Sequence, residues 1–141
     1  MLVGTAFLFT PAAARLAKLE GYDPYATFIP AIRFIQNKYP NHRFLNDYEL
    51  GGVLIATARG TLPVFIDGRG DTAYPAQLVK DYTDILYAAP GWEKLLDTYK
   101  IDGIILTSYR SNPILLPRFE QRTGWEKVFS DEAVIIYVRA K

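Results

Sequence analysis

The chain has 141 residues, of which 50% are hydrophobic and 14% aromatic, and it contains no cysteine. This much buriable surface excludes a disordered chain, and the missing cysteines exclude disulfides, thiolate metal sites and a cysteine nucleophile. A net charge of +1 gives no electrostatic footprint for nucleic acid, which is therefore excluded as a partner.

Residues 1–24 are expected to precede a single α/β domain that spans residues 25–141. The stretch Met1–Thr10 is apolar but shorter than the roughly 20 residues of a membrane-spanning helix. No basic residue precedes it, so a signal peptide is not indicated. It is either an ordinary core segment or the cut end of a membrane helix. Pro11–Leu19 has the composition of a short helix, which Gly21 would end.

The spacing of apolar residues from 25 to 39 predicts a helix that begins near Pro30. After a turn, Arg43–Asn46 reads as a brief strand. Asp47 then stands where a helix N-cap belongs, and a helix is expected over residues 49–58. Gly51 and Gly52 in its first turns indicate close packing against another backbone or a ligand.

The apolar run Leu62–Ile66 predicts a central strand that is buried on both faces. Beyond it, helical patterns cover residues 76–87 and 92–99, and a third apolar strand covers residues 101–107. A polar loop over 108–112 leads to a helix over 114–122, with Pro113 at its start. Two strands at 125–130 and 133–138 flank Asp131 and Glu132 and predict a β-hairpin.

The order of elements after the first helix is therefore βαβαβα followed by a hairpin. Alternating strands and helices favour an open α/β sheet with parallel central strands and helices on both faces. The hairpin adds an antiparallel edge to this sheet.

Two short polar loops follow two of the expected strands. Because the carboxyl ends of parallel strands meet in one crevice, these loops are the candidate binding site. Each loop also has a purely structural interpretation, a helix cap in the first and a turn-shaping ion pair in the second. The candidate binding residues are Asn46, Asp47 and Tyr48 in the first loop, and Asp67, Arg69 and Asp71 in the second.

No cofactor, metal site or catalytic residue is predicted. Neither a dinucleotide-binding G-x-G-x-x-G nor a P-loop follows any expected strand. The single histidine, His42, lies in a turn and is expected to be solvated. If Asp47, Asp67 and Asp71 met, they could hold a divalent cation or bind sugar hydroxyls.

Several short motifs together resemble a known protein family. They are Arg43–Tyr48 with Gly51–Gly52, Pro63–Arg69, Asp81–Tyr82, Trp92 with Leu95–Leu96, Ile101–Leu106, and Gly124–Trp125 before the hairpin. The family is the C-terminal extracytoplasmic domain of bacterial polytopic GT-C-class membrane glycosyltransferases, similar to dolichyl-phosphate-mannose protein mannosyltransferases. The chain departs from the family pattern at Val53, where an aromatic is usual, and at Gly70.

The resemblance implies a domain on the extracytoplasmic face of a bacterial inner membrane, after a bundle of membrane helices. Met1–Thr10 would then be the trimmed end of the last helix. The chemistry would lie in the membrane-embedded part of the same polypeptide, so this fragment alone should be inactive. Its loops would support binding of a glycan or protein acceptor, or docking to the membrane part.

The alternative is a free-standing soluble α/β module of the cytoplasm. It would be a small-molecule-binding protein or an enzyme that uses Asp47, Asp67 and Asp71. The sequence upstream of Met1 would distinguish the two interpretations.

Overall fold

The computed structural model describes residues 25–108 and 113–140. The expected helix at Pro11–Leu19, the stretch Met1–Thr10 and most of the loop at 108–112 lie outside the described residues. Within the two described ranges, no helix has the length and apolar character that crossing a membrane requires.

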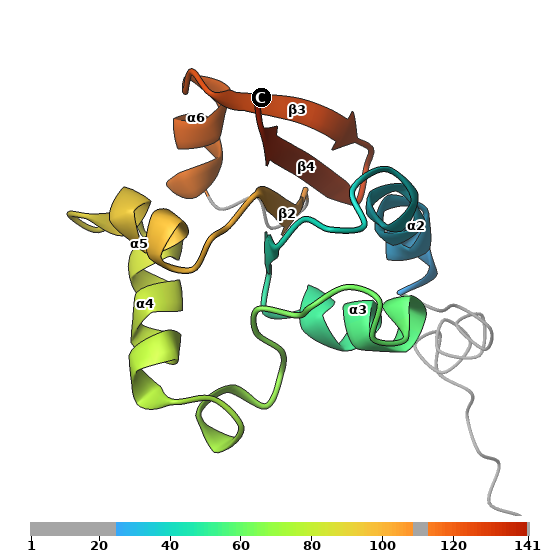
Figure 1. Ribbon diagram of the computed structural model, residues 1–141, viewed down its shortest axis with the longest axis horizontal. Helices are drawn as coiled ribbons and strands as arrows, with labels where there is room; N and C mark the ends of the chain where they lie inside the picture. The colour runs from blue at the N-terminus through green and yellow to red at the C-terminus, as the bar shows by residue number, and fades with distance from the viewer. Residues whose placement is uncertain (1–24, 109–112, 141) are drawn as a thin grey trace, which may run out of the picture.

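Four strands form one open sheet at the centre of the protein (Figure 1). They are β1 (Phe44–Asn46), β2 (Gly103–Thr107), β3 (Trp125–Ser130) and β4 (Val134–Arg139). Their order across the sheet is β1-β2-β4-β3. β1 and β2 are parallel, whereas β4 is antiparallel to both β2 and β3. The predicted class, an open α/β sheet with parallel strands and a C-terminal antiparallel hairpin, is confirmed, although only two strands are parallel where the order βαβαβα predicts three.

The predicted helices within the described residues are all present. They are α2 (Ile29–Lys38) before β1, α3 (Leu50–Ala58) after it, α4 (Ala76–Leu86) and α5 (Trp92–Thr98) before β2, and α6 (Leu115–Glu120) before β3. Two short 3-10 turns, η1 (Ala26–Phe28) and η2 (Gly70–Thr72), were not predicted. Pro30 occupies the first turn of α2, where its missing N–H costs nothing. α6 is shorter than expected, because Pro113 lies in a turn and the helix begins at Leu115.

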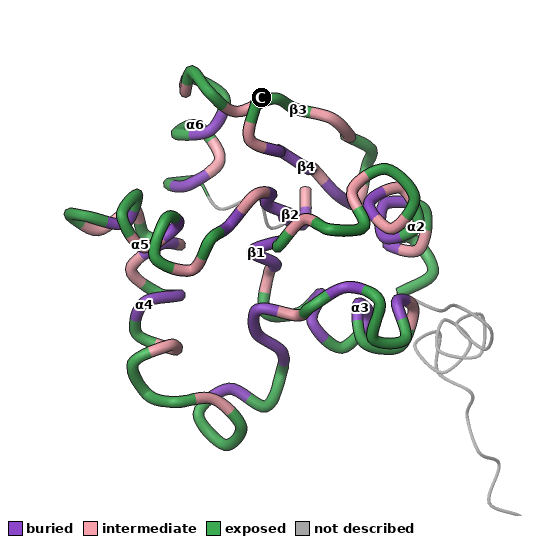
Figure 2. The backbone as a smooth tube through the Cα atoms, viewed as in Figure 1, coloured by how far each residue is buried: buried purple, intermediate pink, exposed green. Residues whose placement is uncertain are grey.

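Helices cover both faces of the sheet, and each face has its own core. Phe44 and Ile105 pack with residues of α2 and α3, whereas Leu45 and Ile104 pack with residues of α4, α5 and α6. Figure 2 shows how burial is concentrated in the strands and the helix faces turned toward them. Every residue of β2 is buried, as a central strand with two covered faces requires.

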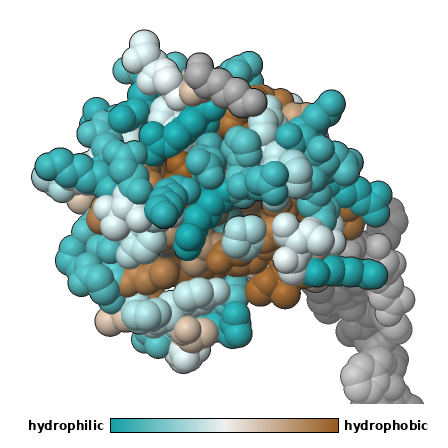
Figure 3. Space-filling model, in the orientation of Figure 1, coloured by the Kyte–Doolittle hydropathy of each residue, from teal (hydrophilic) through white to brown (hydrophobic). Residues whose placement is uncertain are grey.

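The face seen in Figure 3 has hydrophilic residues around its rim and hydrophobic residues toward its middle. This view is taken in the orientation of Figure 1, which places α4 and α5 on one side and α2 and α3 on the other. The arrangement fits two helical layers that meet at the sheet.

The outer strand β3 contains one irregularity. Lys127 pairs with Tyr137 and Phe129 pairs with Ile136, so Val128 is an extra residue on β3. One extra residue on one of two paired strands is a β-bulge, which bends the strand and interrupts its hydrogen-bond ladder.

The predicted strand at Leu62–Ile66 is wrong. The predicted burial is confirmed for Leu62, Phe65 and Ile66, but the stretch is irregular and pairs with no strand. The backbone of this stretch bonds to the Asn46 side chain and not to a neighbouring strand. Asn46 Oδ1 accepts a hydrogen bond from the Phe65 N–H at 2.9 Å, and Asn46 Nδ2 donates one to Ile66 O at 2.7 Å. Pro63 also lacks the N–H that a ladder would use.

The paired glycines of α3 differ from each other. A Cβ on Gly51 would lie 2.2 Å from Ile66 O and 2.5 Å from the Asp67 Cα, so this helix touches another backbone at Gly51. Gly52 has nothing within 4 Å of its Cβ position. The predicted close packing is therefore confirmed at Gly51 and wrong at Gly52.

We predict that Gly51→Ala and Gly52→Ala have opposite effects on stability. Gly51→Ala should lower the free energy of unfolding by about 1–3 kcal/mol or more, because the backbone of Ile66 and Asp67 must move away. Gly52→Ala should raise it by about 0.5–1 kcal/mol, because alanine is the better helix former at an open position. Urea unfolding of the two variants beside the parent chain measures both, and equal effects would contradict the close approach.

Candidate functional site

Asp47 joins the carboxyl ends of the two parallel strands. Asp47 Oδ2 accepts hydrogen bonds from the Thr107 backbone N–H at 2.5 Å and from Thr107 Oγ1 at 2.7 Å. The predicted role of Asp47 as the N-cap of α3 is wrong, because Glu49 occupies that position and makes no side-chain capping bond. Thr107 ends β2 and is buried, so its N–H and hydroxyl need an acceptor that Asp47 supplies.

A hollow of about 480 Å³ opens beside this bond, and we call it the strand-end crevice. It lies at the carboxyl ends of β1 and β2, which is where open α/β sheets bind ligands. Four parts of the chain line it: the loop after β1, the end of α4, the end of β2 and the turn before α6. The lining residues are Asp47, Tyr48, Glu49, Tyr82, Leu86, Tyr87, Thr107, Pro113 and Ile114.

Three tyrosines give the crevice its chemical character. Tyr48 and Tyr87 are exposed, with 39% and 63% of their surface accessible, whereas Tyr82 is buried. Tyr82 Oη accepts a hydrogen bond from the Tyr48 N–H at 2.8 Å and so fixes the loop that carries Tyr48. Burial, and then the nearby carboxylate of Asp47, raise the pKa of Tyr82 well above its usual value. Tyr82 therefore remains a neutral phenol at any physiological pH.

The crevice combines exposed ring faces with carboxylate and hydroxyl oxygens. Tyrosine provides an apolar ring and a polar tip, and a carboxylate accepts hydrogen bonds from hydroxyl or amide groups. Such a lining suits a ligand with both apolar surface and several donors. A sugar and a polar peptide both meet this description.

The second loop is organised around a buried carboxylate. Asp67 accepts hydrogen bonds from the Arg69 backbone N–H at 3.0 Å, from Arg69 Nη2 at 2.7 Å and from Tyr74 Oη at 2.8 Å. The Arg69 guanidinium holds the pKa of the Asp67 carboxyl well below its usual range, despite burial, which opposes this. The Arg69 side chain is 64% exposed, so only one end of this ion pair is buried.

The two loops touch each other. Tyr48 Oη donates to Gly68 O at 2.8 Å, and Asn46 Nδ2 donates to both Asp47 O and Ile66 O. A Cβ on Gly70 would lie 3.0 Å from Tyr48 Oη, in a backbone conformation with a φ of +48° that favours glycine. The glycine at position 70 therefore has a local structural reason.

The structure divides the six candidate residues into groups. Asp47 and Tyr48 line the strand-end crevice. Asn46 and Asp67 are buried and bond to the protein itself, and Arg69 bonds within its own loop. Asp71 is exposed on η2 and takes no part in the Asp67–Arg69 ion pair.

The three aspartates of the alternative interpretation do not form a metal site. Across residues 25–108 and 113–140, no group of three or more His, Asp or Glu side chains is placed to hold an ion. Asp47 is bonded to Thr107, and Asp67 is bonded to Arg69. For Asp67, the structure therefore shows the structural alternative, an ion pair with Arg69 that shapes the second turn.

Tyr82, Tyr87 and Thr107 also line the crevice, although none is among the candidate site residues predicted from the sequence. The abundance of tyrosines, Tyr82 and Tyr87 among them, also allows a carbohydrate platform, but the sequence favours a place in the core. Tyr82 and Tyr87 lie at the end of α4, where helical spacing assigns a tyrosine to the core by default. The available signal was the position of Thr107, a polar residue at the end of an apolar strand parallel to β1.

We predict that Asp67→Ala lowers the free energy of unfolding by about 1.5–3 kcal/mol, because buried charge-assisted bonds are lost. Asp71→Ala is the matched control in the same loop, and as an exposed residue it should change stability by less than about 0.5 kcal/mol. Thermal or urea unfolding compares the two. An unchanged midpoint for Asp67→Ala would show that this carboxylate is not structural.

The stabilisation by Asp67 should also depend on pH. A carboxyl group whose pKa is lowered by folding stabilises the protein above its ordinary pKa and loses this effect as pH falls. The difference in unfolding free energy between the parent chain and Asp67→Asn should therefore be full at neutral pH. It should shrink as pH falls below about 4, the ordinary pKa of aspartate. Urea titrations at a series of acidic pH values test this, and a constant difference would contradict it.

Comparison with known proteins gives a likeness of fold. No protein-family model matches the sequence, and no curated protein matches it. Among solved structures, the chain is similar to the C-terminal globular domain of an oligosaccharyltransferase (AfAglB-S2) from Archaeoglobus fulgidus. The TM-score is 0.52 at 10% sequence identity, over 79% of this chain and 95% of that domain. The protein thus shares its fold with a domain that ends a glycan-transferring enzyme.

Proposed function

We propose that this chain is a noncatalytic accessory domain of a membrane-embedded, lipid-sugar-dependent glycosyltransferase of the GT-C class. The observation that carries the proposal is the fold shared with the C-terminal globular domain of an oligosaccharyltransferase, which this chain matches over 95% of that domain's length. The finer features, a bacterial source and a likeness to protein mannosyltransferases, rest on the sequence motifs alone. The domain would lie on the extracytoplasmic face of the membrane.

Within this proposal, the strand-end crevice contributes to acceptor binding or to docking on the membrane part of the same polypeptide. Tyr48 and Tyr87 supply exposed rings, and Asp47 supplies a carboxylate whose position is fixed by Thr107. These groups recognise a polar ligand by contact and hydrogen bonding. The acceptor would be a glycan or a polypeptide.

We predict that the isolated chain catalyses no sugar transfer from lipid-linked or nucleotide-linked donors, with or without divalent cations. The enzyme that contains the domain should transfer sugar. In that enzyme, Tyr87→Ala should raise the acceptor KM several-fold with little change in kcat. Losing a contact that binds the acceptor equally in the ground state and in the transition state has this effect on the two constants.

Asp71→Asn in the same enzyme is the matched control, because Asp71 is exposed outside the crevice. It should leave both constants unchanged. Reproducible turnover by the isolated chain would contradict the accessory role. A native polypeptide that lacks membrane spans upstream of this chain would contradict the membrane context.

A further inference from the structure

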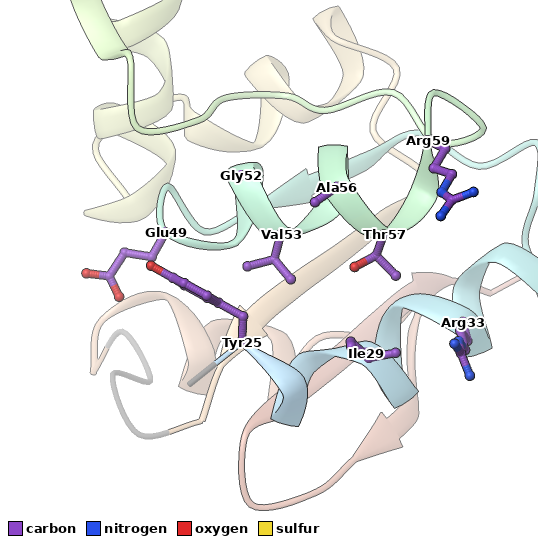
Figure 4. Close-up of a pocket in the computed structure, with 9 residues that line it drawn as sticks. All are labelled: Tyr25, Ile29, Arg33, Glu49, Gly52, Val53, Ala56, Thr57 and Arg59. Carbon is purple, nitrogen blue, oxygen red and sulfur yellow. The ribbon is translucent and has the colours of Figure 1, made fainter. Parts of the chain in front are cut away.

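A second hollow, of about 710 Å³, lies between α2 and α3 (Figure 4), and we call it the helix groove. Ile29 of α2 and Val53 and Ala56 of α3 face each other across it. It is separate from the strand-end crevice except at Glu49, which lines both. The groove therefore has an apolar middle.

The outer face of α3 has an unusual composition for an exposed surface. No charged residue occurs from Leu50 to Ala58, and Thr57 is the one polar side chain of the helix. Helices of this kind are normally buried all round. Here Gly52, Ile55 and Ala56 are exposed, and Ile55 has 46% of its surface accessible. The apolar outer face of α3 is thus open to a partner outside the described residues.

The two ends of the groove differ in charge. Arg33 and Arg59 lie at one end beside Thr57, and Tyr25 and Glu49 lie at the other (Figure 4). Neither guanidinium forms a hydrogen bond or ion pair with any other residue in the described parts of the chain. Two unpaired guanidinium groups beside a hydroxyl are suited to bind a phosphate, through charge and through planar hydrogen bonding.

We propose that the helix groove is a membrane-surface site that binds the headgroup of an anionic phospholipid. The headgroup phosphate would bind Arg33 and Arg59, and Ile55 and Tyr25 would lie at the boundary between headgroups and hydrocarbon. Anionic lipids attract arginine near the bilayer surface, and tyrosine is enriched at that boundary. Apolar and cationic groups on one face are the combination by which proteins lie on a membrane.

The lipid site goes beyond the proposed function and rests on it in one respect. In the proposed function a membrane segment of the same polypeptide tethers the domain to the bilayer. That segment precedes the domain, and Tyr25, the first described residue, lines the groove. A domain held beside a bilayer needs only weak affinity, because the tether supplies a high effective concentration. An orientation with α2 and α3 toward the membrane would follow.

The test measures binding of the full 141-residue chain to vesicles of phosphatidylcholine and phosphatidylglycerol in equal amounts, with phosphatidylcholine vesicles for comparison. Arg33→Gln combined with Arg59→Gln should weaken binding to the mixed vesicles by about fivefold for each guanidinium removed. The matched control is Lys94→Gln combined with Arg118→Gln, which removes the same charge from exposed residues of α5 and α6. The control should retain nearly full binding.

The site of contact is measured separately. Because the chain has no cysteine, Ala56→Cys and Ser130→Cys each give a single position for an environment-sensitive fluorophore. On mixed vesicles the label at residue 56 should shift to the blue, whereas the label at residue 130, exposed on β3, should not.

Equal loss of binding in the two double variants would overturn the proposal, and so would equal binding to both kinds of vesicle. Binding of inorganic phosphate at Arg33 and Arg59 without vesicle binding would assign the groove to a free phosphate instead. Sugar transfer by the membrane enzyme is a different measurement, so failure of this inference leaves the proposed function to be judged on its own.

Discussion

The side-chain amide of Asn46 holds the two candidate loops in one place. It accepts from the Phe65 N–H and donates to Ile66 O, and all three residues are buried. Since Leu62–Ile66 does not join the sheet, this amide is the polar link between the edge strand β1 and that stretch. Because this amide fixes the position of Ile66, the next residue, Asp67, packs against Gly51, and Gly68 O accepts a hydrogen bond from Tyr48 Oη. Removing the amide would leave buried backbone groups without partners, which is the costly way to lose a hydrogen bond.

The parts of the fold that could be predicted are those whose signal is local. Helical spacing located α2, α4 and α5, and the two strand-like runs on either side of Asp131 and Glu132 located the hairpin of β3 and β4. The wrong prediction of a strand at Leu62–Ile66 has a physical origin. An apolar β-branched run indicates that its side chains are buried, but it does not show which partner forms hydrogen bonds with its backbone N–H and C=O groups. That partner is a side chain about 20 residues earlier, and no periodicity shows it.

The candidate site shows the same limit. An aspartate after a strand and before a helix indicates a cap, yet Asp47 bonds to Thr107, 60 residues away. The position of Asp47 and Tyr48 at the carboxyl end of a strand could be predicted, because it depends only on the order of elements. Tyr82 and Tyr87 reach the same crevice from a helix, and only the packing of α4 on the sheet places them there. Fold likeness at 10% identity likewise concerns the architecture alone and says nothing about these particular side chains.

The bulge at Val128 limits the association of this protein with other chains through the edge of its sheet. β3 is the outer strand of the sheet, and its free side would otherwise present an even row of donors and acceptors to the strand of another molecule. The extra residue breaks that row midway, and the exposed, charged side chains of Glu126 and Lys127 lie directly before it. An incoming strand cannot pair along the whole of β3, so the sheet is protected from growing by addition of further chains at this edge.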